Sequence, residues 1–293
     1  MTSRLPIAAL ILVQLIFGFN YAASKVILEQ YPPLLWGGIR MIIAAILMFA
    51  CAFMVVPKSQ RRIDREFLFR TFLYAFFGIA LCQGFFLLGL RYTTTTNCAI
   101  LNTLTPIFTL MFAVLFKREK WTVLRGLGFF IAVLGVLVLR RVEDFSLASG
   151  TFKGDIFTML SCTSLALFFI LSRDFLKKNS PFWATAWMFF FGAILLMIAG
   201  ASDYAHVVPE HLDSRMWIAM TYSVVAATMI TYFLNSWTLT KVNSSSVALF
   251  IYLQPVIAVL NAWFSKDEVP SGRTLLAMIC IFTGVSLGVI KRG

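Results

Sequence analysis

Apolar runs of membrane length follow one another along almost the whole chain, with only short polar connections between them. Each run is close to the roughly 20 residues that cross a bilayer as a helix. With 60% hydrophobic and 13% charged residues among 293, the chain cannot build a water-facing surface around this material. The sequence predicts an all-α membrane protein with ten transmembrane helices, over residues 6–28, 33–56, 67–90, 94–116, 121–139, 154–172, 181–202, 215–239, 243–264 and 270–290.

Basic residues are distributed unequally between the two sides that ten crossings define. Fourteen Lys and Arg fall on the side of the termini, eight on the other side and three within spans. Because positively charged loops stay in the cytoplasm, we expect both termini there and the connection 203–214 outside. These loops account for the net charge of +12, so the predicted surroundings are a lipid bilayer and no nucleic-acid partner is expected.

The two halves of the chain carry the same landmarks in the same order. Each half has five predicted crossings, an odd number, so the second half enters the membrane upside down. We therefore predict two inverted five-helix repeats, residues 1–142 and 143–293, with a substrate site near mid-membrane between them, as in secondary transporters. The matched pairs are Ala99 and Ala248, Pro106 and Pro255, Glu119 and Glu268, and Gly135 and Gly284 at an offset of 149, with Ser24 and Ser172, Lys25 and Arg173, and Pro33 and Pro181 at an offset of 148.

A short motif in the first span is followed by a second span that begins with proline and contains an arginine. The first span reads Phe17-Gly18-Phe19-Asn20 and continues to Lys25, and the second has Pro32-Pro33 and then Arg40. This pattern resembles the EamA family of the drug/metabolite transporter superfamily, with Phe17 where the family commonly has Trp. Further matching positions are Leu104, Thr105, Pro106, Glu119, Leu253, Gln254, Pro255 and Glu268.

Within that family the chain is most similar to the YddG-type exporters of aromatic amino acids. The resemblance implies a transporter in the bacterial inner membrane that exports aromatic and other neutral amino acids. It also implies alternating access, in which rocking of the two halves exposes a central cavity to each side in turn. The alternative is an exporter of other small metabolites or drugs, with or without proton coupling.

Acidic residues are absent from the middle of the predicted spans, since all thirteen Asp and Glu fall at span ends or in loops. Membrane proteins that bind cations or couple to protons usually keep an ionisable group inside the bundle. We therefore expect a neutral to weakly positive cavity that suits zwitterionic or uncharged solutes. Proton coupling through Lys25 or a tyrosine with a shifted pKa is a second option.

Polar side chains repeat at helical spacing within several predicted spans. In a bilayer such groups face either a water-filled cavity or another helix, and for the amides the sequence leaves both alternatives open. Large aromatic residues near these stripes are further candidates for cavity contact. The predicted substrate-binding residues are Asn20, Tyr21, Gln83, Asn102, Trp187, Tyr222, Asn235, Tyr252 and Gln254.

Two basic residues and two prolines are candidates for charge or gating roles. Lys25 either forms an ion pair with Glu29 or takes part in binding. Arg40, about 10 Å into its span, either pairs with Glu29, caps carbonyls of a neighbouring helix or holds a substrate carboxylate. Pro106 and Pro255 each remove a hydrogen bond in mid-helix, so each is a hinge or a fixed kink.

Metal, cofactor and enzyme chemistry have little support in the sequence. Five cysteines lie in apolar runs without paired spacing, and His206 and His211 share one loop without a metal-binding pattern. We therefore predict no metal, no cofactor and no enzymatic activity.

The last predicted span contains a GxxxG motif at Gly284 and Gly288. Such motifs allow close helix packing in membranes. We expect this one to pack the last span against the fifth, near Gly128 and Gly135, rather than against a second copy, so the predicted protein is a monomer.

Overall fold

The computed structural model describes residues 4–93, 95–139, 152–206, 213–254, 256–257 and 272–289. These residues form helices and contain no strand, which confirms the all-helical prediction. Six helices are long and apolar enough to cross a membrane, and shorter apolar helices cover Leu104–Leu115, Val123–Gly135 and Leu275–Val285. The six are α1 (Arg4–Leu28), α2 (Pro33–Val55), Arg65–Tyr92, α8 (Phe152–Lys178), α9 (Pro181–Ala199) and Ser214–Lys241. The count of ten crossings stays a prediction.

Two of the long helices, each of 28 residues, contain a wide π-helical turn. In the first, η2 (Phe76–Leu81) joins α3 (Arg65–Ala75) to α4 (Cys82–Tyr92). In the second, η5 (Tyr222–Ile230) joins α10 (Ser214–Thr221) to α11 (Thr231–Lys241). Wide turns of this kind occur frequently at functional sites.

The predicted fourth span is broken at Thr103, between α5 (Thr95–Asn102) and α6 (Leu104–Leu115). Pro106 explains the break, because its ring clashes with the carbonyl four residues earlier and it has no N–H to donate. Near the predicted ninth span, α12 (Ser244–Leu249) tightens into the 3-10 helix η6 (Phe250–Tyr252). Pro255 lies outside the described residues.

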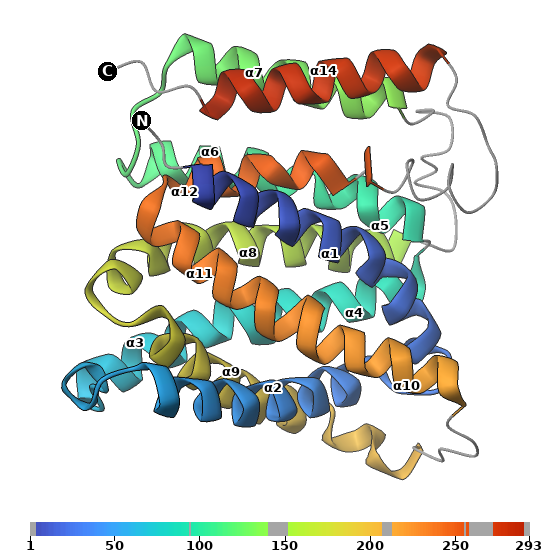
Figure 1. The fold of residues 1–293 in the computed structure, drawn as a ribbon. Coiled ribbons are helices and arrows are strands. Elements are labelled where there is room, and N and C mark those ends of the chain that lie inside the picture. Colours follow the sequence, from blue (N-terminus) through green and yellow to red (C-terminus); the bar gives the residue numbers. More distant parts are fainter. Residues whose placement is uncertain are drawn as a thin grey trace.

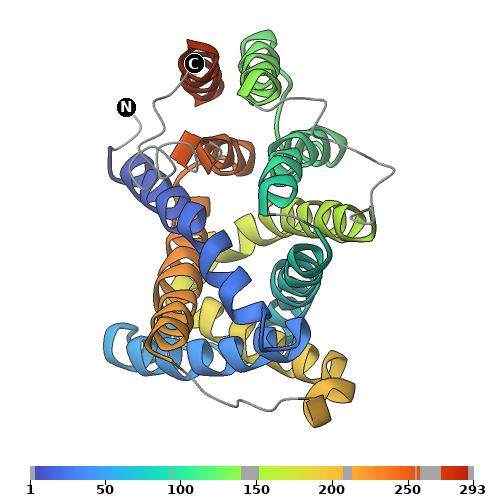
Figure 2. The same cartoon turned by 90° about the vertical axis from the view of Figure 1, so that its right-hand side faces the viewer.

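Paired helices form the two edges of the molecule. At one edge α7 (Val123–Leu139) packs along α14 (Gly272–Val289), and at the opposite edge α2 packs along α9 (Figures 1 and 2). A Cβ added at Gly284 would lie 2.6 Å from the Gly128 carbonyl oxygen and 2.5 Å from the Ala132 nitrogen, so this glycine permits the close approach of α14 to α7. The predicted packing of the last span against Gly128 is confirmed.

The start of α1 and the end of α14 lie at the same end of the molecule, with the connections 56–64, 116–122, 179–180 and 242–243 (Figure 1). We call this the terminal end and the opposite one the far end. Short 3-10 turns, η1 (Lys58–Gln60) and η4 (Ala201–His206), lie in the connections after α2 and α9.

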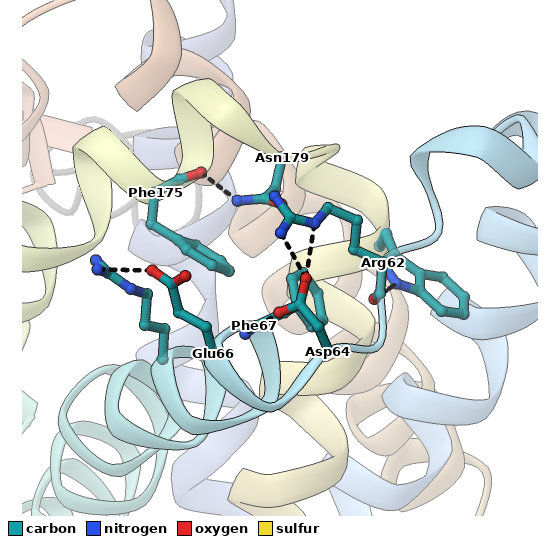
Figure 3. A network of polar contacts seen from close by, with 8 residues as sticks. Arg62, Asp64, Glu66, Phe67, Phe175 and Asn179 are labelled. Carbon is teal, nitrogen blue, oxygen red and sulfur yellow. Dashed lines mark hydrogen bonds and ion pairs between the residues drawn. The ribbon is translucent and has the colours of Figure 1, made fainter.

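An aspartate caps the start of each of the two helices that contain a π-helical turn, and these starts lie at opposite ends of the molecule. At the terminal end, Asp64 accepts a hydrogen bond from the Phe67 N–H at 2.8 Å and one from Arg62 Nε at 2.9 Å (Figure 3). At the far end, Asp213, which lies 149 residues later, accepts from the Met216 N–H at 2.8 Å. A carboxylate at this position satisfies a free N–H of the first helical turn.

Candidate functional site

A cavity lies near the middle of the long helices, between α1, α4, α5, α8, α11, α12 and the segment that follows α12. Its volume of about 50 Å³ holds water molecules but is below the roughly 300–1,000 Å³ of pockets for drug-sized ligands. None of the described residues that line it is charged. The lining consists of Gln14, Phe17, Asn20, Tyr21, Cys82, Gln83, Phe86, Asn102, Ser161, Leu165, Phe169, Asn235, Val247, Ile251 and Gln254.

Helical spacing explains how the sequence gathers these side chains. Gln14, Phe17 and Tyr21 step along α1 by three and four residues, which places them on one face. Ser161 and Leu165 do the same on α8. The cavity wall is therefore made of one stripe from each helix, partly amide or hydroxyl and partly apolar.

A hydrogen-bond network crosses one wall of the cavity. The Tyr21 hydroxyl donates to Gln254 Oε1 at 3.0 Å and accepts from Asn102 Nδ2 at 2.7 Å. Gln254 Nε2 in turn donates to Gln14 Oε1 at 2.8 Å. The network joins α1 and α5 to a segment near the other end of the sequence.

Two amides of the lining have side-chain oxygens without a partner in the part of the chain that the structure describes. Asn20 is 4% exposed and Asn235 is 8% exposed, and the Oδ1 atom of each is buried. A buried polar atom left without a hydrogen bond is costly. A solute that donates hydrogen bonds to these oxygens would remove that cost.

Gln83 connects the cavity to a buried chain of polar groups behind it. Its Nε2 donates to the Tyr232 hydroxyl at 2.6 Å, and Tyr232 donates to the Gly78 carbonyl oxygen, in η2, at 3.0 Å. Arg40 donates to Gln83 Oε1 through Nη2 and to Ser223 Oγ through Nη1 at 3.2 Å. Arg40 does not line the cavity, although the residue that it contacts does.

Lys25 acts at a helix end. Its Nζ donates to the Leu90 carbonyl oxygen at 3.0 Å, at the end of α4, and Arg91 of α4 donates to the Leu28 carbonyl oxygen at the end of α1. Each helix thus supplies a cation to the unpaired carbonyls of the other. Neither Lys25 nor Arg40 forms an ion pair with Glu29.

Three of the predicted binding residues lie away from the cavity. Trp187 packs edge-on against Phe49 of α2, with ring centroids 5.5 Å apart. Tyr222 donates its hydroxyl to a backbone carbonyl of α1, and Tyr252 is buried beside the ring of Phe129. The structure brings the other six together in the lining: Asn20, Tyr21, Gln83, Asn102, Asn235 and Gln254.

Several lining residues were not among those predicted. Ser161 belongs to a hydroxyl stripe on α8 with Thr158, at a spacing of three, and this signal was available in the sequence. Leu165, Phe169 and Ile251 carry no such signal, since an apolar side chain in a span fits a cavity, a helix contact or lipid equally well.

Buried carboxylates occur near the two ends of the molecule. Asp155, in the first turn of α8, accepts from Thr93 Oγ1 at 2.7 Å at the far end. Glu119, after α6, accepts from the Ser245 N–H at 3.2 Å and from Arg125 Nη1 at 2.9 Å at the terminal end. The Asp155–Thr93 contact and the Glu119–Ser245 contact each link the first half of the sequence to the second.

Metal ligation finds no support in the part of the chain covered by the structure. No group of three or more His, Cys, Asp and Glu side chains there is arranged to hold an ion. His206 closes η4, whereas His211 lies outside the described residues.

Several proteins similar to this chain bear the name of uncharacterized transporters. A sequence profile of the EamA-like transporter family matches twice, over residues 4–141 and 152–290. The uncharacterized transporter YoaV of Bacillus subtilis is 21% identical over 94% of this chain and 94% of its own length. An uncharacterized transporter of Archaeoglobus fulgidus is 26% identical over 97% and 96%, respectively. A solved crystal structure superposes with a TM-score of 0.77 at 17% identity, over 96% of this chain and 95% of that one, which shows a shared fold.

Proposed function

The chain belongs to the EamA-like transporter family, and on that premise we propose that it exports aromatic and other neutral amino acids. The proposal rests on the central cavity. The lining residues that the structure describes are uncharged, and they include Asn20 and Asn235 with their unpartnered oxygens. An α-amino group donates hydrogen bonds to such oxygens. Phe17 and Phe86, in the same lining, offer an apolar surface to an aromatic side chain.

The proposed architecture is two inverted five-helix repeats, residues 1–142 and 143–293, with ten crossings and both termini cytoplasmic in a bacterial inner membrane. Two matches to one family profile support the repeat. So do the aspartate caps Asp64 and Asp213, which begin equivalent helices at opposite ends of the molecule (Figure 1). The π-helical turns η2 and η5 follow these caps and end at matching positions, Leu81 and Ile230.

The proposed mechanism is alternating access between these repeats. Because the cavity measures only about 50 Å³, an amino acid enters only after the walls move apart. The break beside Pro106 is a natural place for such movement, since the helix already lacks continuity there. The network of Tyr21, Asn102 and Gln254 then exchanges its internal hydrogen bonds for bonds to the solute.

The proposed driving force is the gradient of the solute itself, through facilitated diffusion or exchange. No described acidic residue lines the cavity, so the walls offer no carboxylate to carry a proton with the solute. A proton-coupled exporter of other metabolites would have to carry the proton on a group other than a carboxylate, such as Tyr21 or Cys82 of the same lining.

Transport by the purified protein in liposomes tests the proposal. We expect uptake of labelled phenylalanine and threonine without a pH gradient, and reduced uptake by Asn102→Ala. The control is Thr71→Ala, because the Thr71 hydroxyl is buried and donates to the Phe67 carbonyl oxygen of its own helix at 2.8 Å, away from the cavity. Strict dependence on the gradient would contradict the proposed driving force, and absence of uptake would contradict the proposed substrate.

A further inference from the structure

Arg40 is a buried cation in the first half of α2. It is 1% exposed, and both of its hydrogen-bond partners, Gln83 and Ser223, are neutral. Its Nε atom has no hydrogen-bond partner within the described ranges. Hydrogen bonds to uncharged side chains therefore hold the guanidinium in place, and neither partner compensates its positive charge.

Ion pairs among the described residues leave this charge uncompensated. The four pairs join Arg62 to Asp64, Arg70 to Glu66, Arg118 to Asp174 and Arg125 to Glu119, and none involves Arg40. Arginine keeps its proton in proteins, and an unpaired charge inside a membrane is costly. An ionisable side chain at such a position indicates a functional role for its charge.

Gln83 places this charge directly behind the cavity wall. Its side chain lines the cavity, while its Oε1 atom accepts from Arg40 and its Nε2 atom donates to Tyr232. The positive charge is thus one side chain away from a bound solute. In a low-dielectric interior, electrostatic attraction over this distance is much stronger than in water.

The matching position in the second half carries no charge. At the offset of 148 that aligns Pro33 with Pro181, Arg40 falls on Met188, a buried apolar residue. At this pair of positions the positive charge therefore comes from the first half alone. A zwitterion experiences different walls on its two sides, with Arg40 behind one and the unpartnered oxygen of Asn235 on another.

We infer that Arg40 is a positioning residue that gives the cavity a preference for solutes with a carboxylate, which is drawn toward Gln83. The inference rests on the proposed function and adds to it the ionic form and orientation of the solute. Arg40 acts on the solute through Gln83 and does not touch it.

Competition by phenylalanine and by phenylalaninamide, which lacks the carboxylate, tests the inference in liposomes. In the wild type we expect the acid to compete about tenfold better than the amide, and in Arg40→Met we expect this ratio to fall to near one. Gln83→Glu places a carboxylate beside the guanidinium and compensates its positive charge, while Arg40 stays in place. The preference for the acid over the amide should therefore fall in this variant too. Arg40→Lys retains the charge and should retain most of the ratio.

Ser223→Ala is the matched control for a merely structural role. It removes one hydrogen-bond partner of Arg40 but no charge, so the wild-type ratio should persist. An unchanged ratio in both Arg40→Met and Gln83→Glu would overturn the inference. So would a collapse of the ratio in Ser223→Ala as large as that in Arg40→Met.

A second readout separates this inference from the proposed substrate. Cys82 lines the cavity, so a small ligand there should slow its modification by methyl methanethiosulfonate, followed by peptide mass spectrometry. We expect acetate to protect Cys82 better than acetamide in the wild type but not in Arg40→Met. If no amino acid is transported and this difference persists, the substrate proposal fails and the inference stands; equal protection by the two ligands overturns the inference.

Discussion

Gln83 and Tyr232 are 149 residues apart, the same offset that separates Pro106 from Pro255, and form a direct hydrogen bond of 2.6 Å between Gln83 Nε2 and the Tyr232 hydroxyl. The same hydroxyl donates to the Gly78 carbonyl oxygen, in the π-helical turn η2. One hydroxyl therefore ties the helix Arg65–Tyr92 to the helix Ser214–Lys241 beside the cavity.

Tyr232→Phe should destabilise the protein. The change leaves Gln83 Nε2 without its acceptor and the Gly78 carbonyl without this donor, so we expect the free energy of unfolding to fall by about 1–3 kcal/mol. Thermal unfolding in detergent measures the effect. Tyr252→Phe is the control, because its buried hydroxyl has no partner within the described residues, and equal losses in the two variants would contradict the prediction.

The amides of the cavity could be found from the sequence because a polar side chain inside an apolar span faces either a water-filled cavity or another helix. Asn20 and Asn235 both lie in the lining of the cavity, which is one of the two surroundings that this reasoning leaves open. Trp187 shows the limit of the same reasoning, since an aromatic ring is equally stable against other helices, where the structure places it. Composition and periodicity do not distinguish these surroundings.

The partners of Arg40 could not be predicted from the sequence. Its depth in the span is readable from Pro33, but Ser223 lies 183 residues away, in a π-helical turn that periodicity does not reveal. The nearby Glu29, a candidate by sequence distance, is not its partner. The structure shows a further arrangement, in which Arg40 donates to the side chains of Gln83 and Ser223, and it is long-range packing that brings these two partners to it.

Stability should depend on pH through Asp64 at the terminal end. The hydrogen bond from the Phe67 N–H, and then those from Arg62, lower the pKa of this carboxyl below its ordinary value of about 3.9. Since the folded pKa is the lower one, the stabilisation is present above about pH 3.9 and is lost as the pH falls through the folded pKa. Unfolding midpoints measured from pH 6 to pH 2.5 should therefore fall less steeply in Asp64→Asn than in the wild type.

Glu66→Gln provides the comparison for that experiment. Glu66 forms an exposed ion pair with Arg70 one turn away and does not cap the helix (Figure 3). Its replacement should leave most of the acid dependence in place. An equally flattened pH profile in both variants would show that the capping carboxylate is not the cause.

Gly284→Ala should separate α14 from α7. The added Cβ would lie 2.5 Å from the Ala132 nitrogen and 2.6 Å from the Gly128 carbonyl oxygen, both backbone atoms that cannot rotate away. We expect a loss of about 1–3 kcal/mol in the free energy of unfolding, as for other overpacked sites. Gly272→Ala, at the start of the same helix, meets nothing within 4 Å, so a loss of similar size there would contradict the steric explanation.

Asp155 and Glu119 should bias the transporter in opposite directions. Asp155 holds Thr93 at the far end, and Glu119 holds Ser245 at the terminal end, so each carboxylate links the two halves at one end only. If the halves rock, loss of either link favours opening at its own end, by about fivefold for an interaction worth about 1 kcal/mol. Cys82, in the cavity lining, reports which end is open.

A membrane-impermeant thiol reagent, added to one side of oriented liposomes, makes this measurement. Asp155→Ala should speed modification of Cys82 from the far end, and Glu119→Ala should speed it from the terminal end, each relative to the wild type. Asp155→Asn retains an acceptor for Thr93 and should resemble the wild type. Faster modification from both sides in both alanine variants would contradict the prediction. It would mean that the changes loosen the whole bundle, because a general loss of packing has no preferred direction, whereas the loss of a link at one end opens that end.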